Sequence, residues 1–120
     1  DLYQDNDAPK VYEDESIKEA IIQISSKILG ATAVLDRNEK LVGIITDGDV
    51  RRMLETVENI SNIKSRDIMS KNPKSIRKNE LAIRAFNIMK QNKIMQIIVA
   101  DGDKYLGMVH LHHILKEGIV

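Results

Sequence analysis

The first apolar pattern in the chain repeats every three or four residues. It runs through "ESIKEAIIQISSKILG" (residues 15–30), where isoleucines and an alanine share one face of a helix. Ser16, followed three residues later by Glu19, is typical of a capping box at a helix start. Gly30 suits the C-terminal stop. The pattern therefore predicts an amphipathic helix that ends at Gly30.

Two short apolar runs follow this helix. They read "ATAVLD" (31–36) and "LVGIIT" (41–46), and the polar "RNEK" separates them. Runs of this length, rich in β-branched residues and split by a polar turn, predict two strands joined by a turn. The polar "DGD" (47–49) then opens a second predicted helix.

The same order of elements returns in residues 80–115. Matched residues lie 65 apart at first, and 64 apart after a one-residue gap in the turn. The matched pairs include Ala20 and Ala85, Val34 and Val99, and Gly43 and Gly107, and the two prolines, Pro9 and Pro73, also lie 64 apart. An internal repeat of this kind indicates two copies of one structural unit.

The repeat predicts an α+β fold of two halves related by a pseudo-twofold axis. Each half is expected to be a small sheet flanked by helices. Since one half cannot cover its own sheet, we expect the two sheets to face each other. We place the N-terminal junction, first motif and linker in 1–63 and the second motif in 64–120. The polar stretch 55–67 is the predicted linker.

Composition narrows the class of protein. The 120 residues are 42% hydrophobic, which supports a real core, and 18 basic side chains balance 18 acidic ones. The net charge is therefore zero, so charge does not indicate a nucleic-acid or membrane-surface partner. With no cysteine there are no disulfides or thiolate zinc sites. The polar start lacks a signal peptide, and no initiator methionine stands at position 1. We expect a cytoplasmic piece of a longer protein.

These residues resemble a tandem pair of CBS domains, often called a Bateman module. The resemblance rests on "NPKSI", on "ATAVLD…LVGIITDGD" and on the T-x-x-D spacing of Thr46 and Asp49. More narrowly, "GIITDGDVRRML", "RDIMSKNPKSI" and "GMVHLHHILKEGIV" resemble the C-terminal part of the arabinose-5-phosphate isomerases. CBS pairs of sugar nucleotidyltransferases carry a similar "TDGDIRR" segment, but the H-x-H ending favours the isomerases.

The isomerase resemblance implies an upstream sugar-isomerase domain in the same chain that holds the catalytic residues. That enzyme would convert ribulose 5-phosphate to arabinose 5-phosphate for Kdo and lipopolysaccharide biosynthesis. The sequence contains no nucleophile–base constellation of its own, so we expect a regulatory segment that is not catalytic. Adenine nucleotides are the usual CBS ligands, and a cytidine nucleotide such as CMP-Kdo is an alternative end-product effector. A ligand-free oligomerisation scaffold is the other hypothesis.

The junction "TDGD" holds the first candidate site residues. The resemblance assigns phosphate contact to Thr46 and ribose contact to Asp49. For Asp47 we favour the role of N-cap, and Gly48 either relieves strain or lets a ligand approach the backbone. Capping and ligand binding both stay open for Asp49. The turn and helix start are expected to explain Gly48 and Asp47, but not the T-x-x-D spacing.

Further candidates lie outside this junction. Arg51 and Arg52 are adjacent, so we expect them on different helix faces, where one can contact phosphate or an acidic partner. Val11 and Thr32 complete the expected ligand-binding set of the first half. In the second half His110 and His113 replace the T-x-x-D pair, so two equivalent sites are not expected.

Two further groups of candidate residues are the histidines and a basic segment. For the histidines, among them His112, a pocket wall or a contact with the missing domain is favoured over a metal site. A basic segment precedes the second helical repeat, and it either binds phosphate or keeps a loop soluble. Its members are Lys71, Lys74, Arg77 and Lys78.

Overall fold

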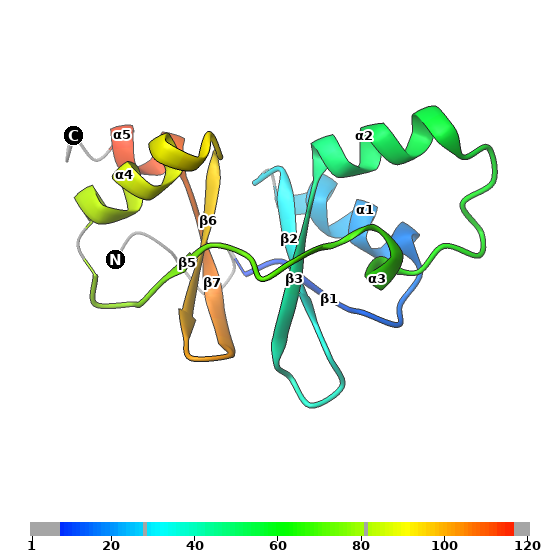
Figure 1. Ribbon diagram of the computed structural model, residues 1–120, viewed down its shortest axis with the longest axis horizontal. Helices are drawn as coiled ribbons and strands as arrows, with labels where there is room; N and C mark the ends of the chain where they lie inside the picture. Colours follow the sequence, from blue (N-terminus) through cyan, green and yellow to red (C-terminus); the bar gives the residue numbers. More distant parts are fainter. Residues whose placement is uncertain (1–7, 28, 81, 117–120) are drawn as a thin grey trace.

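The computed structural model describes residues 8–27, 29–80 and 82–116. It has two halves, each a small sheet with helices on its outer face (Figure 1). The first half contains β1 (Lys10–Tyr12), α1 (Ile17–Lys27), β2 (Ala31–Leu35), β3 (Leu41–Thr46), α2 (Asp47–Thr56), α3 (Ser65–Ile68) and β4 (Ser70–Lys71). The second contains β5 (Ser75–Ile76), α4 (Ala82–Asn92), β6 (Gln96–Asp101), β7 (Lys104–His110) and α5 (Leu111–Lys116).

The two sheets share the arrangement of three strands, and the first sheet has a fourth strand at its edge. The first has the order β1-β2-β3-β4 and the second β5-β6-β7. The short strand that follows each proline pairs in parallel, β1 with β2 and β5 with β6, whereas β2–β3 and β6–β7 are antiparallel hairpins. Each hairpin has a register shift at the matched position, after Val34 and after Val99. The predicted repeat and its helix–strand–strand–helix order are confirmed.

The predicted linker is partly wrong. The helix α2 continues to Thr56, and the short helix α3 begins at Ser65. The strand β4, which the sequence did not predict, pairs with β3 of the first sheet. It can approach closely because Gly43 lacks a side chain: a Cβ there would lie 2.9 Å from the carbonyl oxygen of Ser70. The segment after the predicted boundary at 63 and 64 thus packs on the first half, and the boundary itself stays a prediction.

Both ends of α1 differ in detail from the sequence pattern. Gly30 has a φ of +73°, the left-handed conformation that glycine favours, but α1 ends at Lys27, before the predicted stop. At the other end the hydroxyl of Ser16 accepts from the amide of Lys18 at 3.2 Å. The amide of Glu19 donates to the Ser16 carbonyl oxygen instead. The predicted hydroxyl-to-Glu19 bond of a capping box is therefore wrong for this helix.

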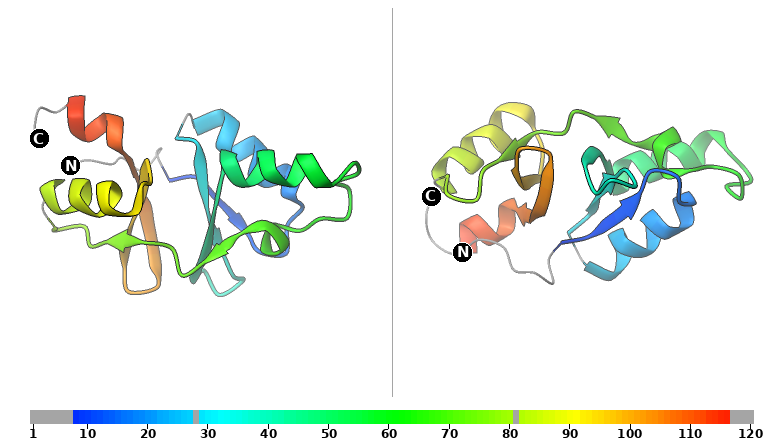
Figure 2. Two further views of the ribbon diagram at one scale, coloured as in Figure 1. Left: turned by 45° about the horizontal axis from the view of Figure 1, so that its top comes forward. Right: turned by 90° about the horizontal axis from the view of Figure 1, so that it is seen from below.

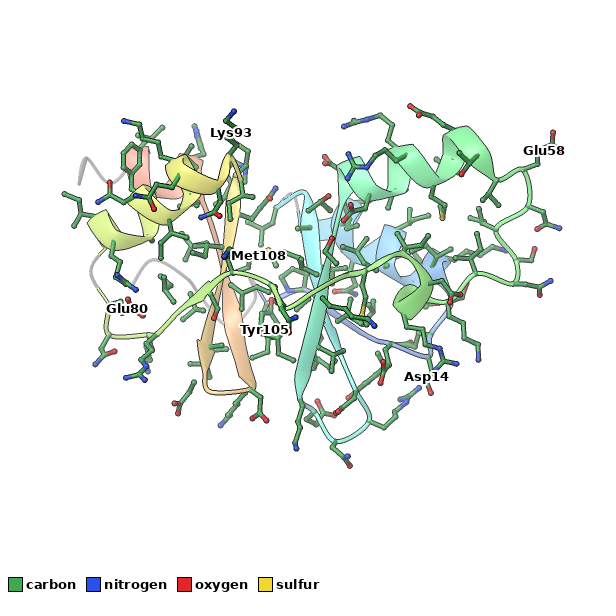
Figure 3. The ribbon with its side chains drawn as sticks, in the orientation of Figure 1. Asp14, Glu58, Glu80, Lys93, Tyr105 and Met108 are labelled. Carbon is green, nitrogen blue, oxygen red and sulfur yellow. The ribbon has the colours of Figure 1, made fainter. Side chains whose placement is uncertain are left out.

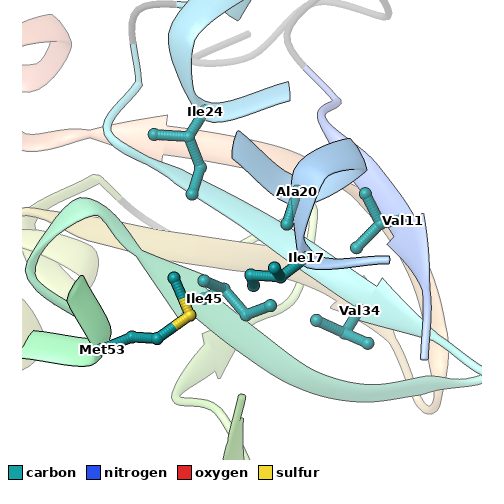
Figure 4. Packing of buried hydrophobic residues seen from close by; sticks show 7 residues of the cluster. All are labelled: Val11, Ile17, Ala20, Ile24, Val34, Ile45 and Met53. Carbon is teal, nitrogen blue, oxygen red and sulfur yellow. The ribbon is translucent and has the colours of Figure 1, made fainter. Parts of the chain in front are cut away.

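Three apolar clusters hold the fold together. One lies between the first sheet and its helices (Figure 4) and consists of Val11, Ile17, Ala20, Ile24, Val34, Ile45 and Met53. Its counterpart in the second half consists of Ile76, Ala85, Met89, Ile97, Val99 and Val109. The third lies between the sheets and consists of Leu29, Ala31, Ala33, Ile98, Ala100 and Met108, with Leu41, Ile44 and Tyr105 packed against it.

The third cluster confirms that the two sheets face each other. Seen from below, the sheets lie between the helices of the two halves (Figure 2). Every residue of β2 is buried because helices cover one face of the strand and the other sheet covers the other. The small side chains of Ala31 and Ala33 fit this double coverage. The amide of Leu41 donates to the Asp103 carbonyl oxygen at 2.8 Å, which ties the two hairpin ends together.

One polar group inside this interface has no hydrogen-bond partner among the described residues. Tyr105 and Met108 lie between the sheets (Figure 3), and the buried Tyr105 hydroxyl meets no donor or acceptor in the described ranges. Burial raises the pKa of the Tyr105 phenol well above its ordinary value. The matched position in the first half is Leu41, so the interface carries an apolar side chain on one side and a phenol on the other.

Candidate functional site

The candidate site begins where β3 becomes α2. Thr46 has extended backbone angles and is the N-cap of α2. Its hydroxyl accepts from the Asp49 amide at 3.2 Å, and the Asp49 carboxylate accepts from the Thr46 amide at 2.9 Å. This reciprocal pair is a capping box.

The capping box corrects two of our interpretations. Asp47 is the first residue of α2 and not its N-cap, because the strand stays extended through Thr46. The T-x-x-D spacing is explained by the helix start itself, since a hydroxyl at the N-cap reaches the third amide of the helix. Whether Thr46 and Asp49 also contact a ligand stays a prediction.

Two guanidinium groups converge on this helix start. A Cβ built on Gly48 would lie 3.4 Å from Arg52 Nη1 and 3.7 Å from Arg51 Nη2. Although Arg51 and Arg52 are adjacent, both side chains turn back toward the N-terminus of the helix, a direction that long helical side chains favour. The two guanidinium groups thus lie near the same residue, although adjacent positions leave a helix on different faces.

The two arginines at this helix start differ in their ion pairing. Arg52 pairs with Asp49 at 2.6 Å, and the Asp49 side chain is only 14% exposed. Arg51 forms no ion pair with any residue that the structure describes. First-turn amides of a helix have no intrahelical acceptor, and the helix dipole is positive there. The Asp47 and Asp49 amides already have acceptors in the chain, so the groups left for a phosphate are the Gly48 amide and the Arg51 guanidinium.

The matched junction in the second half uses the same backbone bond. The Asp47 amide donates to the Gly30 carbonyl oxygen at 2.9 Å, and the Leu111 amide donates to the Met95 carbonyl oxygen at 2.8 Å. His110 occupies the place of Thr46. Its Nδ1 accepts from the His112 amide at 2.9 Å, so an imidazole caps α5.

The other histidines add little to this junction. The side chain of His113 lies outside the described residues, so its expected ligand contact stays a prediction. The rings of His110 and His112 meet edge to face with centroids 6.5 Å apart. Across the described part of the chain, no three histidine or acidic side chains gather as metal ligands.

A cleft of about 560 Å³ lies between the two halves beside these junctions. Its lining comprises Ile24, Ser25, Leu29, Gly30, Asp47, Met95, Gln96 and His110. Asp47 and His110 come from opposite halves. Gln96 Nε2 donates to the Leu29 carbonyl oxygen at 2.9 Å across the pseudo-twofold axis. A Cβ on Gly30 would lie 2.9 Å from that nitrogen, so glycine keeps the contact open.

Sequence reasoning found only part of this lining. It named His110 and gave Asp47 only a capping role, and it missed the other cleft residues, which are Ile24, Ser25, Leu29, Gly30, Met95 and Gln96. The available signal was the repeat, because Gly30 and Met95 are matched positions that precede matched strands. Thr46 and Asp49 do not line the cleft and lie at the adjacent helix start.

Two expected ligand-binding residues lie in the core. Val11 is 3% exposed and packs in the cluster beneath α1. Thr32 is fully buried on β2, where its hydroxyl donates to the Ala33 carbonyl oxygen at 3.2 Å. Neither lines the cleft, and their ligand contact stays a prediction.

Comparison with known protein families gives two matches to one model. The model described as the CBS domain matches residues 3–56 and again 65–119. Arabinose 5-phosphate isomerase KdsD of Yersinia pestis is 36% identical over 119 residues, and the protein of that name in Escherichia coli K12 is 33% identical. The alignments cover 99% of this chain but 36% of each isomerase. The chain therefore spans about a third of the length of these relatives.

Solved structures show the same fold at low identity. The CBS domain protein PAE2072 from Pyrobaculum aerophilum complexed with AMP superimposes with a TM-score of 0.84 at 15% identity, covering 97% of this chain and 93% of that one. None of the helices within the described ranges combines the length and apolar character needed to span a bilayer.

Proposed function

The chain belongs to the CBS domain family, and we propose that it is a regulatory module that binds an adenine nucleotide at the α2 start and the adjoining cleft. The observation that carries the proposal is the convergence of Arg51 and Arg52 over Gly48. The structures of similar fold include one complexed with AMP. Another, the CBS domain pair of MJ0100, is in complex with 5-methylthioadenosine and S-adenosyl-L-methionine.

The proposed ligand contacts divide by chemistry. The phosphate takes the Gly48 amide and the unpaired Arg51 guanidinium, because the Asp47 and Asp49 amides are already bonded within the chain. Asp49 already accepts from Thr46 and Arg52, and its carboxylate has remaining lone pairs for a ribose hydroxyl. The apolar side chains of Leu29 and Met95 face the cleft and suit a purine ring.

Regulation follows from the position of the cleft. Its lining comes from both halves, with Asp47 on one side and Gln96 on the other. A ligand that contacts both sides favours one relative position of the halves, and so shifts the population of states. We propose that the shift is transmitted to an upstream sugar-phosphate isomerase domain, because the isomerase relatives extend well beyond the matched third. A cytidine nucleotide such as CMP-Kdo is the alternative effector.

Calorimetry with AMP tests the proposal on two matched variants. Asp49→Asn keeps an oxygen acceptor for the Thr46 amide but removes the charge, and we expect AMP to bind about tenfold more weakly. Asp67→Asn is the control, because Asp67 accepts from the Lys64 amide at 2.9 Å in the same capping role on α3. Its AMP affinity should stay within about twofold of the parent.

Parallel titrations with CMP and CMP-Kdo identify the nucleotide class. No heat with AMP, CMP or CMP-Kdo would contradict nucleotide binding, and so would equal weakening in both variants.

The second candidate function is a scaffold for oligomerisation. Ile22 on α1 and Leu54 on α2 are 54% and 55% exposed, which leaves apolar side chains on the outer helices. Sedimentation of the chain with and without nucleotide separates the two functions. A stable dimer that no nucleotide binds favours the scaffold.

A further inference from the structure

A second hollow, of about 700 Å³, lies at the start of α4. Its lining is distinct from that of the cleft and consists of Arg77, Lys78, Asn79, Ala100, Asp101 and Leu106. The neighbouring Glu80 lies below α4, on the side of the molecule away from α2 (Figure 3). The nucleotide proposal uses none of these residues.

The backbone around this hollow repeats a turn of the first half. The Tyr12 amide donates to Glu15 Oε1 at 2.8 Å, and the Arg77 amide donates to Glu80 Oε1 at 2.8 Å. The return bonds, from each glutamate amide to the carbonyl oxygen three residues earlier, are 2.9 and 3.1 Å long. The two turns are therefore equivalent, and their side chains can be compared position by position.

In the first half the side chains of this turn form contacts with charged residues of the hairpin turn between β2 and β3. The Arg37 guanidinium lies 4.2 Å from the centre of the Tyr12 ring, and the Tyr12 hydroxyl donates to Glu39. Arg37 also pairs with Asp14 at 3.0 Å, and this hydrogen-bonded pair holds the pKa of Asp14 below its ordinary value. The charge of Arg37 and the ring of Tyr12 therefore both have partners within the first half.

In the second half the equivalent side chains are unmatched. Arg77 replaces Tyr12, Lys78 replaces Glu13 and Asn79 replaces Asp14. Neither Arg77 nor Lys78 forms an ion pair with any residue in the described ranges. The nearby Glu80 carboxylate is already occupied by the Arg77 amide and by Arg84. Two cations therefore border an open hollow.

We propose that this hollow binds the phosphate monoester of a sugar. Arg77 and Lys78 supply the charge for a phosphate, and the Asn79 side chain can donate to it. Asp101 would repel a bare anion, but its carboxylate accepts from sugar hydroxyls. Leu106, which is half-buried, gives the carbon face of the sugar an apolar contact. The site is separate from the nucleotide cleft and does not depend on it.

An NMR titration of the 120-residue chain with ribose 5-phosphate tests this site. We expect saturable shifts at the amides of Ala100 and Leu106. Arg77→Ala/Lys78→Ala should weaken binding about tenfold, which is the scale of a lost charged hydrogen bond. Lys71→Ala/Lys74→Ala removes the same charge from the neighbouring segment outside the hollow and should stay within about twofold.

Two further arms identify the ligand chemistry. Asp101→Asn should weaken ribose 5-phosphate but not inorganic phosphate, because the proposed Asp101 contact is to the sugar hydroxyls and inorganic phosphate has no sugar. Prior saturation with AMP should leave ribose 5-phosphate binding intact. Equal losses in the two double variants, displacement by AMP, or no saturable shifts would each overturn the proposal, whatever the outcome of the AMP calorimetry.

Discussion

The two strand-to-helix junctions share a backbone and differ in chemistry. Thr46 caps α2 through a hydroxyl, whereas His110 caps α5 through an imidazole nitrogen. The amide after each cap donates to a matched carbonyl oxygen, at 2.9 and 2.8 Å. The repeat thus keeps the backbone bonds that build the sheet and helix, while any acceptor of suitable reach can serve as the cap.

This difference concentrates phosphate chemistry at one junction. The first adds a carboxylate at the third helix position and two arginines over Gly48. The second has no charged residue among "HLHH", and α5 begins with a leucine. Equal backbone geometry with unequal side chains predicts unequal affinity of the two sides for an anionic ligand.

The largest predicted effect on stability concerns the apolar clusters between each sheet and its helices, where one substitution makes the first half more like the second. Ile17 is fully buried beneath the first sheet, and its matched residue in the second half is Ala82. Ile17→Ala should lower the free energy of unfolding by about 3 kcal/mol, because it leaves a cavity that the sheet cannot close. Urea unfolding measures the change.

A matched control for this substitution lies on the same helix. Ile22 is 54% exposed, so Ile22→Ala should change the free energy of unfolding by less than about 1 kcal/mol. Similar losses in the two variants would show that burial does not set the difference.

A smaller effect is expected at the caps. Thr46→Val keeps the branched shape but removes the hydroxyl, and should cost about 1 kcal/mol of stability. Thr46→Ser keeps the acceptor and should cost less than about 0.5 kcal/mol. Thermal unfolding of the two variants measures this. A Val variant as stable as the parent would mean that the capping bond does not hold the first junction.

An effect no larger than that at the caps, and of opposite sign, is expected at the interface between the sheets. Tyr105→Phe brings that position closer to its counterpart Leu41 by removing a buried hydroxyl that has no hydrogen-bond partner in the part of the chain that the structure describes. The free energy of unfolding at pH 7 should rise by about 1 kcal/mol. Tyr12→Phe is the control, because the Tyr12 hydroxyl is bonded to Glu39 and should give no gain. A loss of stability in Tyr105→Phe would reveal a partner for the hydroxyl.

The same variant predicts a pH dependence. Burial raises the pKa of Tyr105 in the folded state, so the unfolded state releases the proton first, from about pH 10 upward. The parent should therefore lose stability as the pH rises above that value, and Tyr105→Phe should lose less. Unfolding curves between neutral and alkaline pH compare the two.

The elements were predictable because their signals are local. The apolar spacing in "IKEAIIQ" and the alternation of strand and turn residues need no knowledge of the rest of the chain. The repeat then supplied the facing sheets, because neither half can bury its sheet alone. Where a choice depended on fine geometry the prediction was wrong, as for Asp47, since which residue caps a helix depends on where the strand stops being extended.

The candidate site was less predictable, because its residues meet only through packing. The side chain of Gln96 reaches the carbonyl oxygen of Leu29, 67 residues earlier, and that bond lies at the cleft. The convergence of Arg51 and Arg52 depends on side-chain direction, which adjacent positions in a sequence do not reveal.

The sequence by itself determined a duplicated α+β module and most of its helices and strands, because periodicity and turn chemistry act over a few residues. Only the tertiary structure decided which groups share a cleft, which cations stay unpaired and where a phenol is buried. These outcomes depend on contacts between segments far apart in the chain, and so on how the two sheets pack. The T-x-x-D spacing shows both levels, since it forms a helix cap and leaves ligand binding to be measured.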